Sequence, residues 1–193
     1  GLLVTSAMYT AAFECSFGTF IRLEFDEIYD GMLGAPLSVK DAMVGEMVWA
    51  GSKGFFFSLA VLAVIVPFGI ISNPYSLFAP FVGLATGLMF AGFSLFITSF
   101  VHTINHFNFY FTGFLSPMFF FSGVVFPVTN LPEVVQPVSY ALPLTHAVNL
   151  VRMLCIRGWE PGIPVLWSIV YIAVFILVFG FLAVKQLERR IID

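Results

Sequence analysis

The amino-acid sequence predicts an all-α polytopic membrane protein, and two observations lead to this prediction. Of the 193 residues, 60% are hydrophobic and 10% are charged, whereas about a quarter of the residues in a soluble domain are charged. Between Lys53 and Glu133 there are 79 residues without any Asp, Glu, Lys or Arg. Because one helical crossing of a bilayer needs only about 20 residues, this run has room for three crossings.

The apolar segments predict about five crossings in a single transmembrane domain that covers residues 1–193. We expect these helices at residues 1–21, 49–71, 76–101, 107–125 and 161–184. The chain begins inside an apolar run without an initiator Met, so we expect a further N-terminal portion before it. The apolar surface predicts membrane lipid as a partner, and the net charge of −3 gives no indication of nucleic acid.

The first expected crossing contains one acidic residue, Glu14. A carboxylate inside a membrane is costly and is therefore a candidate for a functional role. Alternatively, Glu14 lies near the membrane boundary, because only about two helical turns separate it from Arg22. Both interpretations stay open from the sequence.

Residues 22–48 form a charged interruption, which we interpret as a cytoplasmic coupling region. The stretch from Arg22 to Lys53 holds nine of the nineteen charged residues. Apolar side chains recur there at the spacing of one helical face and acidic side chains occupy the other face, which predicts a short amphipathic helix. The coupling residues, including a proline in the break after this helix, are expected to be Phe25, Asp26, Ile28, Tyr29, Met32, Leu33 and Pro36.

A second helix is expected to begin directly after this break and to run into the membrane. Ser38 and Asp41 have the spacing of a capping box, which would satisfy free backbone amides at the start of a helix. An amphipathic helix lying flat among lipid headgroups is the alternative for the first helix, but such helices are usually rich in Lys and Arg. The acidic face therefore favours a protein partner.

The third and fourth crossings carry features of helix packing. Gly83, Gly87 and Ala91 follow one another at four-residue spacing and predict a close helix contact. The aromatic cluster of the fourth crossing is expected to pack on helices or lipid, or alternatively to line a path for a lipid tail. The possible pathway residues are Glu14, Met118, Phe119 and Phe120.

Residues 126–161 are apolar but interrupted by prolines every five or six residues, so no crossing helix of normal length fits there. We expect an extracytoplasmic re-entrant region of two short helices, at about 132–140 and after Pro143, with Thr145 as the cap of the second. If Arg152 is exposed we expect it to reach the headgroups, and if it is buried we expect it to pair with a carboxylate, Glu133 and Glu160 being the nearest in sequence. The expected gate residues are Pro127, Pro132, Pro143, His146 and Arg152.

The distribution of basic residues predicts the orientation in the membrane. Six of the eight Lys and Arg residues lie in the stretch 22–53 or in the C-terminal tail, and two lie near the prolines. Because cytoplasmic loops carry an excess of Lys and Arg, we expect the coupling region and the C-terminus in the cytoplasm.

The sequence has none of the motifs of an ATPase, a zinc protease or a serine hydrolase, and we expect neither catalysis nor a metal or cofactor site in this chain. An acidic amphipathic helix on the cytoplasmic side favours force delivered by a soluble partner.

Two stretches resemble the type-2 ATP-binding-cassette exporter permeases. The first, GMLGAPLSVKDAMVGEM at residues 31–47, is similar to the end of their cytoplasmic coupling loop. The second, SPMFFFSGVVFPVTNLPEVVQPVSYALPLTHAVNLVR at residues 116–152, is similar to their signature, with Ser-Gly-x-x-Phe-Pro, Leu-Pro-Leu-Thr-His and a closing Arg. The opening LLVTSAMYTAAFE, together with GEMVWAGSK, looks closest to the nodulation-factor exporter permeases, a branch that handles lipo-oligosaccharides and polysaccharides.

The resemblance implies a permease subunit with six crossings in the full chain, located in the bacterial cytoplasmic membrane. It further implies a second permease copy, in a homodimer or heterodimer, and separate ATPase subunits that bind the coupling helix and use ATP and magnesium. Two other functions stay open from the residues alone, a passive or proton-coupled transporter or channel, and a membrane assembly protein without transport.

Overall fold

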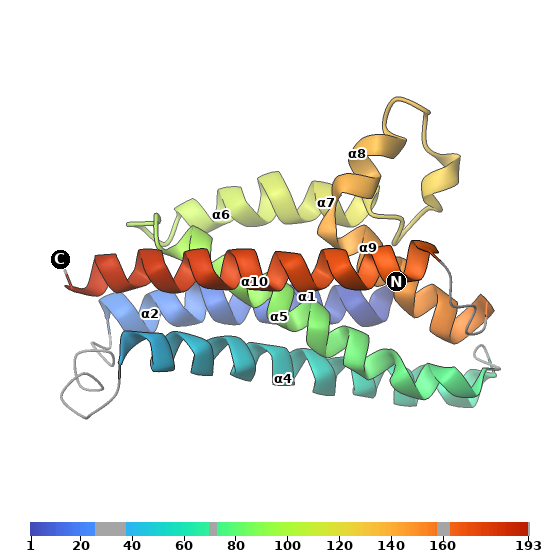
Figure 1. The fold of residues 1–193 in the computed structure, drawn as a ribbon, viewed down its shortest axis with the longest axis horizontal. Coiled ribbons are helices and arrows are strands. Elements are labelled where there is room, and N and C mark those ends of the chain that lie inside the picture. The colour runs from blue at the N-terminus through green and yellow to red at the C-terminus, as the bar shows by residue number, and fades with distance from the viewer. Residues whose placement is uncertain (26–37, 70–72, 158–162, 193) are drawn as a thin grey trace.

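The computed structural model describes residues 1–25, 38–69, 73–157 and 163–192, and these form a bundle of helices without a strand (Figure 1). The helices are α1 (Leu2–Phe13), α2 (Thr19–Glu24), α4 (Val39–Ile65), α5 (Ala79–Thr98), α6 (His106–Tyr110), α7 (Ser116–Phe121), α8 (Gln136–Ala141), α9 (Pro143–Arg152) and α10 (Ile163–Ile192). Three π-helical turns connect or extend them, at Glu14–Gly18, Phe111–Leu115 and Met153–Arg157. The predicted all-α fold class is confirmed.

Three helices in the described ranges are long and apolar enough to cross a membrane, and they match three of the expected crossings. They are Val39–Phe68, Pro74–Thr98 and Val165–Arg190. The helix α4 begins at Val39, because the predicted capping box is formed. Ser38 accepts a hydrogen bond from the Asp41 amide, and the Asp41 carboxylate accepts one from the Ser38 amide.

The other two expected crossings are helical but differ from these three. Residues 2–24 form one helical run through a π-helical turn, and they carry Glu14 and Arg22. The run His106–Phe121 rises about 24 Å, which is short of the roughly 30 Å hydrocarbon core. It ends before residue 125, because Gly123 adopts φ = 79° and turns the chain.

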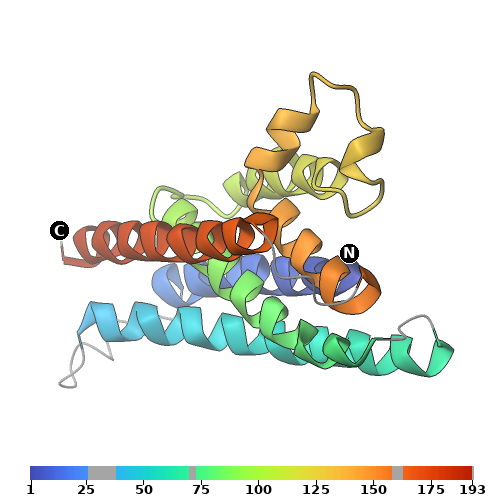
Figure 2. The same ribbon diagram turned by 45° about the vertical axis from the view of Figure 1, so that its right-hand side comes forward.

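The two ends of the bundle hold different parts of the chain. The end of α2, the start of α4 and the C-terminus lie together at one end, which we call the coupling end (Figure 1). The N-terminus and α9 lie at the opposite end (Figure 1). Figure 2 shows α8 and the segment before it standing away from the bundle, whereas α9 lies against it.

Small residues bring α1, α4 and α5 into close contact, as predicted for Gly83 and Gly87. A Cβ atom at Gly54 of α4 would lie 2.9 Å from the Gly83 carbonyl oxygen and 3.2 Å from the Gly87 Cα. The same Cβ would lie 3.3 Å from the Cβ of Ala7 in α1. The three helices therefore approach one another as closely as their backbones allow.

Aromatic rings hold the segment 106–121 against the first helical run. Phe107 lies 5.1 Å from Phe17 and 5.5 Å from Phe20, measured between ring centroids. Phe111 lies 5.3 Å from Phe13. Large aromatic side chains fill the space between these two segments, whereas glycines let the backbones of α4 and α5 touch.

Candidate functional site

Four charged side chains form an ionic cluster between the first helical run and α4. The Glu14 carboxylate lies 2.6 Å from Lys53 Nζ and 3.2 Å from Arg22 Nη1. The Arg22 guanidinium also contacts both carboxylate oxygens of Glu46, each at 2.9 Å. The cluster thus alternates base and acid in the order Lys53, Glu14, Arg22, Glu46, and its net charge is zero.

Helical spacing explains why these side chains meet. Glu14 and Arg22 are about two turns apart on one helical run, and Glu46 and Lys53 are about two turns apart on α4, so each pair points along one face. The hydroxyl of Thr19 donates a further hydrogen bond to Glu46.

The charged side chains of the ionic cluster are largely buried, and their pairing therefore affects how the two helices are held together. The side chains of the cluster are between 12% and 31% exposed. Charges removed from water are tolerated only when partners compensate them, so separating the two helices here would leave uncompensated charges. The ionic cluster therefore fixes α2 and α4 relative to each other.

The ionic cluster gives Glu14 partners that could not be predicted from the sequence. Glu14 is paired with Arg22 and with Lys53, which is 39 residues away. From the sequence, the closeness of Arg22 suggested only a position near the membrane boundary. Helical periodicity relates only residues that are close in sequence, so it could not predict the contact between Glu14 and Lys53. The only signal for it was the presence of Lys53 and Glu46 in a helix that enters the membrane.

The predicted coupling residues fall largely outside the described residues. Phe25 directly follows α2; its side chain is 70% exposed, and its ring lies 6.4 Å from that of Phe20. The coupling residues outside the described ranges are Asp26, Ile28, Tyr29, Met32, Leu33 and Pro36. Their role stays a prediction.

At the opposite end, His146 of α9 connects α8 to α10. Its Nε2 lies 3.0 Å from the Tyr140 carbonyl oxygen, and because a carbonyl only accepts, Nε2 carries the hydrogen. Its Nδ1 lies 3.2 Å from the Ser168 hydroxyl, and its ring stacks on Tyr171 with 4.2 Å between centroids. His146 is thus a buried link between two elements of this end.

The start of α9 differs from the prediction in one detail. The helix begins at Pro143, which is buried, and Leu142 stands at its N-cap position without a side-chain cap. Thr145 is not the cap, because its hydroxyl donates to the Ser139 carbonyl of α8. The Thr145 hydroxyl therefore joins the two short helices to each other.

The other gate residues occupy different environments. Arg152 donates to the carbonyl of Gly123. Arg152 is partly buried and Glu133 is exposed, and Glu160 lies outside the described residues. Whether Arg152 also reaches the headgroups or a carboxylate stays a prediction. Pro127 and Pro132 are exposed in the segment that stands away from the bundle. Pro143, His146 and Arg152 all belong to α9, and of these His146 contacts α10.

The possible pathway residues do not form one surface. Met118 is buried in the core, and Phe119 packs on Tyr9 with 6.5 Å between ring centroids. Phe120 is 54% exposed, and Glu14 belongs to the ionic cluster. A lipid-tail path along these residues stays a prediction.

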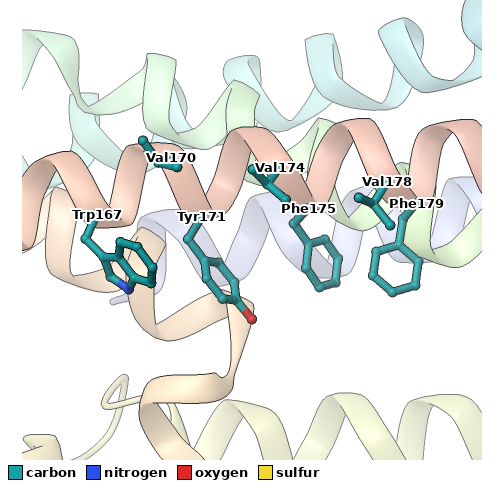
Figure 3. A pocket seen from close by; sticks show the side chains of 7 residues that line it. All are labelled: Trp167, Val170, Tyr171, Val174, Phe175, Val178 and Phe179. Atoms are coloured by element: carbon teal, nitrogen blue, oxygen red, sulfur yellow. The ribbon is translucent and has the colours of Figure 1, made fainter.

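An apolar groove of about 260 Å³ runs along α10, where the sequence suggested only a plain crossing. Figure 3 shows aromatic side chains projecting from one face of this helix. The Tyr171 hydroxyl donates to the Ala141 carbonyl at 2.6 Å, so one end of the groove lies beside α8. The groove is lined by Trp167, Val170, Tyr171, Val174, Phe175, Val178 and Phe179.

The chain is similar to one known family of transporters and to a set of named bacterial proteins. The family model described as ABC-2 type transporter matches residues 1–156. Nodulation protein J of Sinorhizobium fredii (strain NBRC 101917 / NGR234) is 36% identical over 193 residues, which cover 100% of this chain and 73% of that protein. The proteins of the same name from Rhizobium leguminosarum bv. trifolii and Rhizobium meliloti (strain 1021) are 32% and 31% identical. The matches cover 100% and 99% of this chain, and 72% of each of those proteins. No solved structure matches the chain.

Proposed function

The chain belongs to the ABC-2 type transporter family, and from this premise we propose that it is the permease subunit of an ATP-driven exporter. It acts in the bacterial cytoplasmic membrane with a second permease copy, in a homodimer or heterodimer. The relatives are named nodulation protein J, and the resemblance to nodulation-factor exporter permeases supports a lipo-oligosaccharide, polysaccharide or similar amphiphile as the substrate.

The energy comes from a separate subunit in this proposal. The sequence has no phosphate-binding motif of its own, so a partner ATPase binds ATP and magnesium and closes during its cycle. That partner contacts the coupling region at residues 22–48 on the cytoplasmic side, where the exposed Phe25 begins the predicted amphipathic face.

The ionic cluster is the observation that carries this proposal. It joins α2, which leads into the coupling region, to α4, which leads out of it. A displacement of the region between them is therefore transmitted to both helices together. The close contact of Gly54 with α5 passes the same displacement to a third helix.

The test is reconstitution of the full-length permease with its candidate ATPase, followed by measurement of complex formation and ATP hydrolysis. We expect Phe25→Asp and Tyr29→Asp to weaken both, because a charge on the apolar face opposes docking of a helix in a groove. Val134→Asp is the matched control, since Val134 is 85% exposed in the segment between α7 and α8.

Two outcomes would contradict the proposal. If both aromatic variants behave like the Val134→Asp control, the coupling residues are wrongly assigned. If the permease moves its substrate without the ATPase when only a proton gradient is imposed, the protein is a proton-coupled transporter instead.

A further inference from the structure

The last turns of α10 contact three other helices at the coupling end. Arg190 Nη1 donates to the carbonyl oxygens of Thr98 and Val101, at 2.6 and 2.7 Å, and Nη2 donates to the Glu24 carboxylate. Two residues earlier in α10, Glu188 forms an ion pair with Lys40 at 3.4 Å. The end of α10 thus reaches α2, α4 and the C-terminal end of α5.

The position of Arg190 matches the chemistry of its partners. Thr98 is the last residue of α5, and the final carbonyls of a helix lack intrahelical partners and carry partial negative charge. A guanidinium has several N–H donors in a fixed plane, so it can satisfy two carbonyls and a carboxylate at the same time. The Arg190 side chain is only 15% exposed, which favours a fixed geometry over a mobile surface contact.

The helix α10 contacts one residue before the coupling segment and one residue after it. Glu24 is the last residue of α2, before the coupling segment, and Lys40 lies in the first turn of α4, after it. Both are held by one stretch of α10 that is far away in sequence. The Lys40 to Glu188 pair is the weaker link, because the Lys40 side chain is 60% exposed.

We propose that Arg190 is a positioning residue of the coupling mechanism. It connects Glu24, where α2 leads into the coupling segment, to the C-terminal ends of α5 and α10. This inference rests on the proposed function. Displacement of the coupling region then moves α2, α5 and α10 as one body. Without the guanidinium, α2 moves without the other two helices, and ATP hydrolysis proceeds without productive movement of the permease.

The experiment measures export per ATP hydrolysed in vesicles that contain the full-length permease and its ATPase. We expect Arg190→Gln to retain complex formation and hydrolysis but to lower export per ATP about tenfold, the factor expected for loss of a charge-assisted hydrogen bond. Arg189→Gln removes the same charge from an exposed neighbour and should leave this ratio unchanged. Arg190→Lys should fall between Arg190→Gln and the unmodified protein, because an ammonium does not reproduce the planar fork.

Glu24→Gln provides a second variant that does not depend on the tolerance of the bundle for a change at Arg190, because Glu24 is 42% exposed. It should lower the ratio in the same direction, and the double variant Glu24→Gln with Arg190→Gln should be no worse than Arg190→Gln alone. The inference is overturned if Glu24→Gln has the same ratio as the unmodified protein, or if Arg190→Gln lowers hydrolysis and export in equal proportion. Absence of ATP-dependent export in the unmodified protein would instead overturn the proposed function, and this inference with it.

Discussion

The close approach of α4 and α5 makes Gly54→Ala a quantitative test of the packing. The new Cβ would lie 2.9 Å from the Gly83 carbonyl oxygen, where ordinary contact begins at 3.4 Å, so the helices must separate by several tenths of an ångström. Overpacking of this kind costs about 1–3 kcal/mol. Alanine also gains about 1 kcal/mol of helix propensity over glycine, which masks part of the loss in a single measurement.

A matched control removes the propensity term. Gly45→Ala is on the same helix, and its Cβ would have no neighbour within 4 Å, so it gains the propensity without the clash. We therefore expect Gly54→Ala to be less stable than Gly45→Ala by about 2 kcal/mol. For a chain of this size that difference corresponds to a midpoint of thermal unfolding roughly 6 °C lower.

The assay is thermal unfolding of the detergent-solubilised full-length permease, followed by the loss of its monodisperse peak in size-exclusion chromatography. Equal midpoints for Gly54→Ala and Gly45→Ala would refute the close contact of α4 with α5. The transmission of movement from α4 to α5 would then lose its structural basis.

Two further predictions concern the ionic cluster and the orientation. Glu14→Gln leaves Lys53 facing an uncharged amide and should lower the free energy of unfolding by about 2 kcal/mol, less than for a fully buried pair because both side chains are partly exposed. The double variant with Lys53→Met should be no less stable than Glu14→Gln, whereas additive losses in the same unfolding assay would show that the two side chains do not interact. For the orientation, a Cys introduced at Asn130 should react with an impermeant thiol reagent from outside the cell, and one at Asp30 only after permeabilisation. The two native cysteines are buried and should contribute little background labelling. The reverse labelling pattern would show that the orientation in the membrane is opposite to the one predicted.

Features that depend on local chemistry could be predicted from the sequence. The capping box at Ser38 forms because its two partners are only three residues apart. The glycine stripe of α5 packs as expected, because only small residues let helix backbones approach. Prolines from 127 to 143 break the chain into short helices, because proline removes a backbone donor and blocks a helix interior.

The detail that failed was one in which a tertiary partner replaced a local one. Thr145 was expected to cap its own helix, yet its hydroxyl bonds to α8, which the fold places within reach. Arg152 likewise donates to the Gly123 carbonyl, 29 residues away, a contact for which the sequence gives no signal. Many backbone carbonyls can accept a hydrogen bond from such a side chain, and the tertiary fold decides which of them lies within reach.

The sequence by itself determined that this chain is an all-α membrane protein of the ABC-2 type transporter family, because composition, helix breaks and motifs are local properties. Only the tertiary structure decided which charges meet. Glu14 pairs with Lys53, and Glu24 pairs with Arg190 at a separation of 166 residues. An ionic contact depends on distance in space, and the packing of α4 against the first helical run and of α10 against α5 and α4 sets that distance.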